Sequence, residues 1–176
     1  MTSTDDETPI PQDALDEFAD MSLYDMPGHL IRRLQQIAVS IFLDETADSQ
    51  ITTVQFVSLA AVRALPGLDQ MELSRAVAFD RSTIQDVIIR LEKKDLLRRE
   101  ADPADRRRRV LYVTPAGEKV LDEIAPANRR AQARILAPLS PEERRAFMAM
   151  LSRLVDVNNR YSRAPLVEQR APNGEA

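Results

Sequence analysis

Apolar residues recur along most of this chain at the three- and four-residue spacing of amphipathic helices. The first such stretch begins at Pro27, which suits the first turn of a helix because its missing N–H needs no partner there. The stretch ends in the polar segment 44–50. Its apolar face is formed by Leu30, Leu34, Ile37 and Ile41.

Three shorter helices are predicted between residues 52 and 95. Thr52 with Gln55, and Asp69 with Glu72, have the spacing of capping boxes, so each pair predicts a helix start. Asp80 has the character of an N-cap for the next helix, which is predicted to end near residue 95. The buried face of that last helix is predicted to hold Ile84, Val87, Ile88 and Leu91.

The pattern then changes to that of a β-hairpin. Residues 96–100 and 110–114 resemble short strands, and the charged segment 102–109 between them resembles a turn with a basic tip. Thr114 and Pro115 start a long helix in which Pro126 predicts a kink. Ser140, followed by proline and two glutamates, starts a last helix.

This order predicts a mainly α protein with a small β-hairpin. Residues 51–114 form a winged helix-turn-helix, and residues 22–48 and 115–162 form a helical dimerisation region, because their apolar stripes exceed what a small lobe covers. The acidic segment 1–21 is expected to be a mobile arm, and residues 163–176 a frayed tail.

Composition excludes several classes of site. The chain has no cysteine, so disulfides and thiolate chemistry are absent, and its single histidine makes a dedicated metal site improbable. No phosphate-binding glycine loop is evident among four glycines, so we expect neither a cofactor nor an enzyme. No apolar run has the length of a membrane span, and the acidic start is unlike a secretory signal, so we expect a cytoplasmic protein without a membrane partner.

Charge is unevenly distributed. The net charge is −4, but residues 80–110 hold eight arginines and two lysines against seven acids, a local balance of 10 − 7 = +3. Such a patch is compatible with binding duplex DNA, although charge alone equally describes a solvated surface.

The predicted helix beginning at Asp80 has a polar face opposite its apolar one. A recognition helix inserts such a face into the major groove, where serine and glutamine bind base edges and arginine binds guanine or phosphate. Asp86 repels phosphate unless it accepts from a cytosine amine or orients an arginine. The candidate DNA-binding residues here are Arg81, Ser82, Thr83, Gln85, Asp86 and Arg90.

The predicted hairpin turn adds a second candidate DNA contact. Four adjacent arginines, residues 106–109, repel one another unless a polyanion or nearby acids offset them, and arginine suits a narrow minor groove. A merely solvated turn is the alternative. The candidate DNA-binding residues here are Asp105, Arg106, Arg107 and Arg108.

The stretch FDRSTIQDVIIRLEKKDLLRREADPADRRRRVLYVTPAG resembles the MarR family of bacterial regulators. The family's D-x-R wing motif matches Asp105 and Arg107, and the resemblance implies that this aspartate orients a minor-groove arginine. Thr114 and Gly117 match the family's junction between wing and helix. The resemblance extends over about residues 27–158 and implies a dimer formed by the first and last two helices.

The segment MPGHLIRRLQQIAVSIF resembles a MarR subgroup that governs breakdown of aromatic acids. His29 and Arg33 are four residues apart and share a helix face, so they suit a carboxylate effector; an aryl-CoA thioester is the alternative. Two simpler interpretations remain open: Arg32 or Arg33 forms ordinary ion pairs, and the phenylalanines belong to the hydrophobic core. The candidate effector residues are Tyr24, His29, Arg32, Arg33, Phe42, Phe56 and Phe79.

These features favour a ligand-responsive DNA-binding regulator, a repressor of aromatic-acid degradation genes that binds a pseudo-palindromic operator as a homodimer. A winged-helix scaffold that binds proteins without specific DNA binding is the alternative hypothesis.

Overall fold

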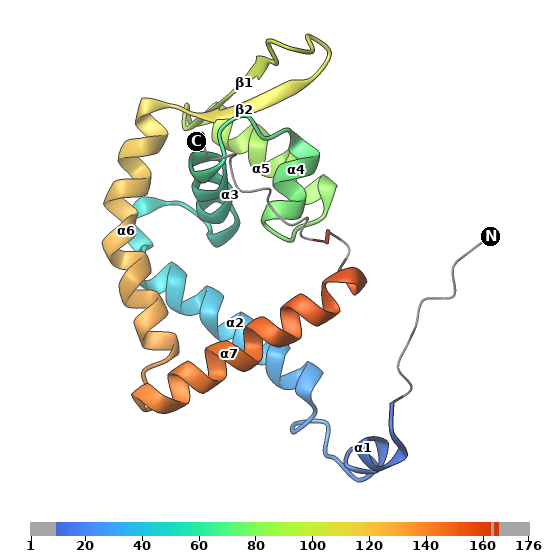
Figure 1. The fold of residues 1–176 in the computed structure, drawn as a ribbon. Coiled ribbons are helices and arrows are strands. Elements are labelled where there is room, and N and C mark those ends of the chain that lie inside the picture. Colours follow the sequence, from blue (N-terminus) through green and yellow to red (C-terminus); the bar gives the residue numbers. More distant parts are fainter. Residues whose placement is uncertain (1–9, 163, 166–176) are drawn as a thin grey trace, which may run out of the picture. The chain divides into compact units, whose positions relative to one another are not determined.

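The computed structural model describes residues 10–162, 164 and 165, and its contacts divide the chain into two units, residues 1–40 and 41–176. Figure 1 labels the elements, and their helical content together with one two-stranded hairpin confirms the predicted fold class. In chain order they are α1 (Gln12–Asp16), α2 (Pro27–Glu45), the 3-10 turn η1 (Ala47–Ser49), α3 (Thr53–Ala64), α4 (Gln70–Ala76), α5 (Arg81–Lys93), β1 (Leu97–Ala101), β2 (Arg109–Val113), α6 (Pro115–Ile135), α7 (Pro141–Asn158) and the 3-10 turn η2 (Asn159–Tyr161).

The first unit contains α1 and most of α2. The amide nitrogen Nε2 of Gln12 donates a hydrogen bond of 3.0 Å to Oδ1 of Asp16 within α1. Apolar spacing does not predict α1, because five residues are too few to show a helical repeat. Residues 1–9 of the expected mobile arm, and most of the expected tail 163–176, lie outside the described residues.

Helix starts in the second unit follow the predicted caps. The side chain of Thr52 accepts from the backbone N–H of Gln55, and the side chain of Gln55 accepts in return from the backbone N–H of Thr52. Asp69 with Glu72, and Ser140 with Glu143, form the same reciprocal pairs. The three predicted capping boxes are therefore confirmed.

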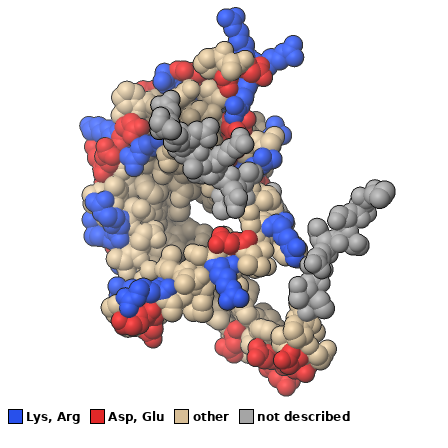
Figure 2. Space-filling view, in the orientation of Figure 1, with Lys and Arg blue, Asp and Glu red and all other residues tan. Residues whose placement is uncertain are grey.

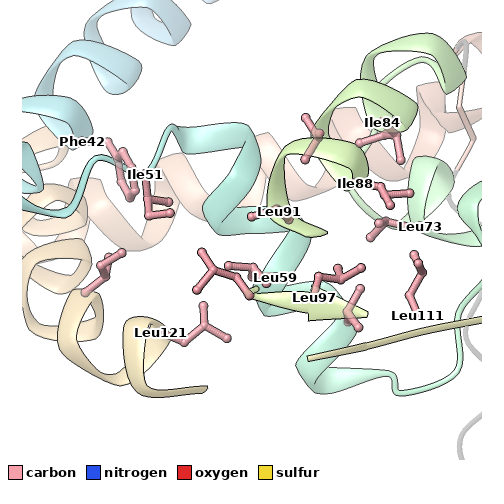
Figure 3. Packing of buried hydrophobic residues seen from close by; sticks show 14 of the residues in the cluster. Phe42, Ile51, Leu59, Leu73, Ile84, Ile88, Leu91, Leu97, Leu111 and Leu121 are labelled. Carbon is pink, nitrogen blue, oxygen red and sulfur yellow. The ribbon is translucent and has the colours of Figure 1, made fainter. Parts of the chain in front are cut away.

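The core of the second unit lies where α3, α4 and α5 pack against the hairpin and α6 (Figure 3). Leu59, Leu73 and Ile88 are completely buried there, with Leu111 from β2 and Leu121 from α6 beside them. Burying a leucine or isoleucine side chain is worth about 1.5–3 kcal/mol, so this cluster fixes the lobe.

Backbone contacts join the hairpin to the segment before α4 and to the start of α6. The backbone N–H of Gly67 donates to the carbonyl of Leu111, and the N–H of Leu111 donates to the carbonyl of Leu68, so the segment before α4 pairs with β2. A Cβ on Gly117 would lie 2.1 Å from the carbonyl oxygen of Leu96, so the junction needs glycine there.

Helices α6 and α7 extend beyond this core. α6 runs without interruption past Pro126. The side chains of Arg130 and Arg134 on α6 bind Glu45 at 2.8 and 2.7 Å. These two arginines, Arg134 first, lower the pKa of the Glu45 carboxyl. α7 contains no buried residue in this structure of a single chain.

Candidate nucleic-acid interface

Helix α5 is anchored by one face and exposes the other. Ile84, Ile88 and Leu91 are fully buried and Val87 nearly so, as the apolar spacing predicts. The opposite face of α5 consists of exposed Arg81, Ser82, Gln85, Asp86 and Arg90, with Thr83 half-buried. The structure therefore brings together on one helix the six candidate residues predicted for base reading.

The start of α5 is fixed by the Asp80 carboxylate. Its Oδ1 accepts from the Ser82 hydroxyl at 2.6 Å and from the backbone N–H of Thr83 at 2.8 Å. Its Oδ2 accepts from the Thr83 hydroxyl at 2.7 Å. The Ser82 hydroxyl, followed by the two Thr83 donors, lowers the pKa of Asp80 far below the usual range. Two predicted base-reading hydroxyls are thus already bonded within the protein.

The tip of the hairpin is a turn built around Asp105. The Asp105 carboxylate accepts from the backbone N–H of Arg107 at 3.0 Å, and its carbonyl accepts from the N–H of Arg108 at 2.9 Å. The resemblance implied that Asp105 orients the Arg107 side chain. In this structure the Asp105 carboxylate holds the backbone from which the Arg107 side chain projects.

Arg108 differs from its neighbours because it is held by carboxylates. Its guanidinium binds Asp69 at 3.1 Å and Asp102 at 3.2 Å, and it also contacts Glu72. The hydrogen bond to Asp69 is the main reason that the pKa of Arg108 is raised. Asp69 and Glu72 are the capping box of α4, so Arg108 links the wing to the helix-turn-helix. Sequence reasoning grouped Arg108 with the DNA contacts, because the partners Asp69 and Glu72 are more than 35 residues away in the chain.

Arg106, Arg107 and Arg109 remain exposed. Within the described part of the chain, no ion pair includes any of the three. Figure 2 shows basic side chains projecting from the end of the hairpin, at the top of the view. Three exposed cations at the tip of the hairpin, without ion pairs to the described residues, make a surface suited to a polyanion.

The candidate effector residues fall on both units. In the first unit, the rings of Tyr24 and His29 meet edge to face with centroids 5.7 Å apart, and Nε2 of His29 is buried without a hydrogen-bond partner in the described structure. Arg32 and Arg33 are exposed on α2.

In the second unit, the rings of Phe42 and Phe56 lie 5.3 Å apart, and Phe42 is 3% exposed. Phe56 and Phe79 pack against the same apolar core. These three phenylalanines therefore have structural roles in the lobe.

A pocket of about 370 Å³ lies elsewhere in the second unit, beside the ion pair of Arg130 and Glu45. Its wall combines Thr46 and Ser49 with α6 and includes none of the predicted effector residues. The described residues contain no cluster of metal-ligating side chains, and none of their helices is long and apolar enough to cross a membrane.

A three-helix lobe followed by a hairpin with an exposed basic tip defines a winged helix-turn-helix protein. Comparison with known proteins specifies the family: the chain belongs to the MarR family, whose sequence model matches residues 51–108. The chain is 34% identical to the HTH-type transcriptional repressor NicR of Pseudomonas putida over 73% of this chain and 82% of NicR.

Two solved structures agree with this assignment. BpsR of Bordetella bronchiseptica, studied for regulation of its DNA binding by 6-hydroxynicotinic acid, is 34% identical, with TM-score 0.73 over 77% of this chain and 97% of BpsR. The PcaV transcriptional regulator of Streptomyces coelicolor, in complex with its natural ligand, is 36% identical, with TM-score 0.71 over 78% of this chain and 97% of PcaV.

Proposed function

We propose that this protein is a transcriptional repressor that binds a pseudo-palindromic operator as a homodimer and is released by an aromatic carboxylate or its CoA thioester. The observation that supports DNA binding most strongly is the wing, where Arg106, Arg107 and Arg109 are exposed and form no ion pair within the described residues. In this proposal α5 enters the major groove and the wing contacts the flanking minor groove.

Exposed apolar side chains support the homodimer. Leu154 is 55% and Val157 68% exposed on α7, and Leu34 is 37% and Ile37 48% exposed on α2. Apolar surface of this kind on helices of a single chain is buried by association with a second copy. Two recognition helices placed one DNA turn apart then read two half-sites.

The effector proposal rests on the first unit and on the relatives. His29 has an unsatisfied buried nitrogen next to an aromatic ring, and Arg33 shares its helix face. BpsR responds to 6-hydroxynicotinic acid, an aromatic carboxylate. A carboxylate bound by Arg33 with His29 as second donor would favour a dimer whose recognition helices are wrongly spaced for DNA.

A mobility-shift assay with the full-length protein and the DNA upstream of its own gene tests the regulator. We expect a specific complex at moderate salt that Arg107→Ala weakens. Absence of a specific complex, with no effect of Arg107→Ala, would leave the scaffold hypothesis as the better account. A pull-down that retains a protein partner after nuclease treatment would then support that alternative.

A thermal-shift screen tests the effector. Benzoate, hydroxybenzoates, hydroxynicotinate and aryl-CoA esters are each added to the native dimer, because a ligand specific to the native state raises the melting temperature. We expect at least one of these compounds to raise the melting temperature and to dissociate the DNA complex, and we expect both effects to be lost in Arg33→Ala. Gln35→Ala, an exposed change on the same helix but on a different face from His29 and Arg33, is the control. A ligand whose effect on the melting temperature is the same in wild type, Arg33→Ala and His29→Ala would contradict the proposed effector site.

A further inference from the structure

The hydroxyl of Ser82 acts as a hydrogen-bond donor to Asp80 in this structure, so its hydrogen points in a known direction. A hydroxyl has one hydrogen to donate and two lone pairs, whereas an ionised carboxylate only accepts. The contact of 2.6 Å between Ser82 and Asp80 therefore uses the serine hydrogen. The pKa of Asp80 is lowered by this bond and by those from Thr83, so the carboxylate is ionised at neutral pH. Ser82, which is exposed, then presents only acceptor lone pairs to a ligand.

Asp86 is a second acceptor on the same face. It lies four residues after Ser82, so the two side chains are neighbours on the helix surface, with Cα atoms about 6 Å apart along the axis. Asp86 is exposed, and no ion pair in the described part of the chain includes it. Its carboxylate, like the bonded Ser82 hydroxyl, accepts hydrogen bonds and donates none.

Base edges differ in which of these groups they complement. In the major groove adenine presents its N6 amino group and cytosine its N4 amino group as donors, whereas guanine O6 and thymine O4 are acceptors. Two acceptors on the protein face therefore attract amino groups and repel the keto oxygens of guanine and thymine.

Resting on the proposed function, in which α5 enters the major groove, we propose that Ser82 and Asp86 form an acceptor pair that selects adenine or cytosine amino groups. Asp80 acts as a positioning residue, because it takes the Ser82 hydrogen without contacting DNA. Gln85 lies on the same exposed face, but its amide both donates and accepts, so it has no fixed preference.

The test begins with selection of DNA sequences from a random duplex pool by the full-length dimer. Wild type, Ser82→Ala, Asp86→Ala and Gln85→Ala are compared. We expect wild type to enrich adenine or cytosine at the positions where Ser82→Ala and Asp86→Ala relax the preference. Gln85→Ala is expected to alter a different position. Enrichment of guanine or thymine at the positions that depend on Ser82 and Asp86 would overturn the inference alone. Enrichment of no sequence by wild type would overturn the proposed function and this inference with it.

Modified bases that lack one hydrogen-bonding group test which group of the base Ser82 contacts. At an adenine assigned to Ser82, 2′-deoxynebularine removes the amino group, and 7-deaza-2′-deoxyadenosine removes the N7 acceptor. At a cytosine, 2-pyrimidinone removes the amino group. We expect loss of the amino group to weaken wild-type binding about tenfold, as for one good hydrogen bond, and to have little effect on Ser82→Ala. Equal weakening of wild type and Ser82→Ala would overturn the assignment.

Asp80→Ser tests the positioning role. Serine is as good an N-cap as aspartate and can still accept the Thr83 N–H, but it removes the carboxylate that fixes the Ser82 hydroxyl. We expect a melting temperature within a few degrees of wild type and a loss of most discrimination against guanine and thymine at the Ser82 position. Unchanged discrimination in Asp80→Ser would overturn the role of Asp80.

Discussion

The recognition helix and the wing are held in place by different forces. α5 is anchored by four apolar side chains that are at most 7% exposed and by the Asp80 cap. The wing tip is held instead by the turn bonds of Asp105 and by the ion pairs of Arg108. Apolar burial changes little with salt, whereas exposed ion pairs weaken as salt rises. We therefore expect the helix to be the fixed part of the proposed DNA interface and the wing to be the adjustable part.

The two regions also differ in the charge that they offer to DNA. The exposed face of α5 holds Arg81 and Arg90 against Asp86, whereas the wing tip presents three arginines that form no ion pair with the described residues. Charge without base contacts gives affinity for any sequence, and hydrogen-bonding groups in the major groove give discrimination. We therefore expect the wing to set affinity and the helix to set specificity.

The largest expected effect concerns the anchoring of α5. Ile88→Ala removes a completely buried side chain and is expected to lower the free energy of unfolding by about 2–5 kcal/mol. Urea unfolding followed by circular dichroism measures this. Ile89→Ala, on the adjacent half-exposed position, is the control and is expected to have a clearly smaller effect. Equal losses in the two variants would show that α5 is not anchored by this face.

Next in size is the loss of wing charge. Arg107→Ala is expected to weaken DNA binding about 10- to 100-fold on specific and scrambled duplexes alike, because it removes a contact to the backbone or minor groove. Two contacts are lost per dimer, so the slope of log affinity against log salt is expected to fall by about 2. Fluorescence anisotropy over a salt series measures both. A loss confined to the specific duplex would contradict the division of roles.

A smaller effect is expected at Arg108. Arg108→Ala releases the wing from Asp69 and Glu72 and removes a cation that these carboxylates already neutralise, so we expect binding to weaken several-fold with little change in the salt slope. The free energy of unfolding is expected to change little, since such ion pairs are partly solvated. Arg109→Ala is the matched comparison, because it removes an exposed cation without an ion pair to the described residues and is therefore expected to lower the salt slope. A salt slope lowered as much by Arg108→Ala as by Arg107→Ala would show that Arg108 contacts DNA.

The smallest effect concerns acid stability. The pKa of Asp80 is lower in the folded protein than its usual value of 3.8, so its contribution to stability is present above that value and is lost as the pH falls below it. Asparagine caps helices as well as aspartate but does not titrate. We therefore expect Asp80→Asn to lose less stability than wild type between pH 5 and about pH 3, measured by urea unfolding. If the free energies of unfolding of wild type and Asp80→Asn fell by the same amount over this pH range, the role of the Asp80 carboxylate would be contradicted.

Much of the fold follows from local patterns. Capping residues and Pro27 predicted the starts of the helices from α2 to α7, and apolar spacing predicted the buried face of α5, because both signals lie within a few residues of each other in the chain. The apolar stripes of α2 and α7 were predicted as well, but they are largely exposed in the single chain. The strands were predicted within one residue of their observed bounds. α1 was not predicted, because it is too short for a repeat.

The site was predicted less completely, for a physical reason. The exposed residues of α5 follow from helix geometry alone. The ion pairs of Arg108 join residues far apart in sequence, and nothing in the run of four arginines distinguishes this one from its neighbours. The direction of the Ser82 hydrogen bond likewise depends on the conformation of the Asp80 cap, which composition does not reveal.

Specific and scrambled duplexes compared in one anisotropy experiment test the central claim most directly. Wild type, Arg107→Ala and Asp86→Ala are measured with the selected operator and with a scrambled duplex at one salt concentration. The account predicts that wild type prefers the operator by at least about 10³-fold, that Arg107→Ala weakens both complexes while keeping that ratio, and that Asp86→Ala lowers the ratio. No preference in wild type, or a ratio that falls with Arg107→Ala and not with Asp86→Ala, would contradict it.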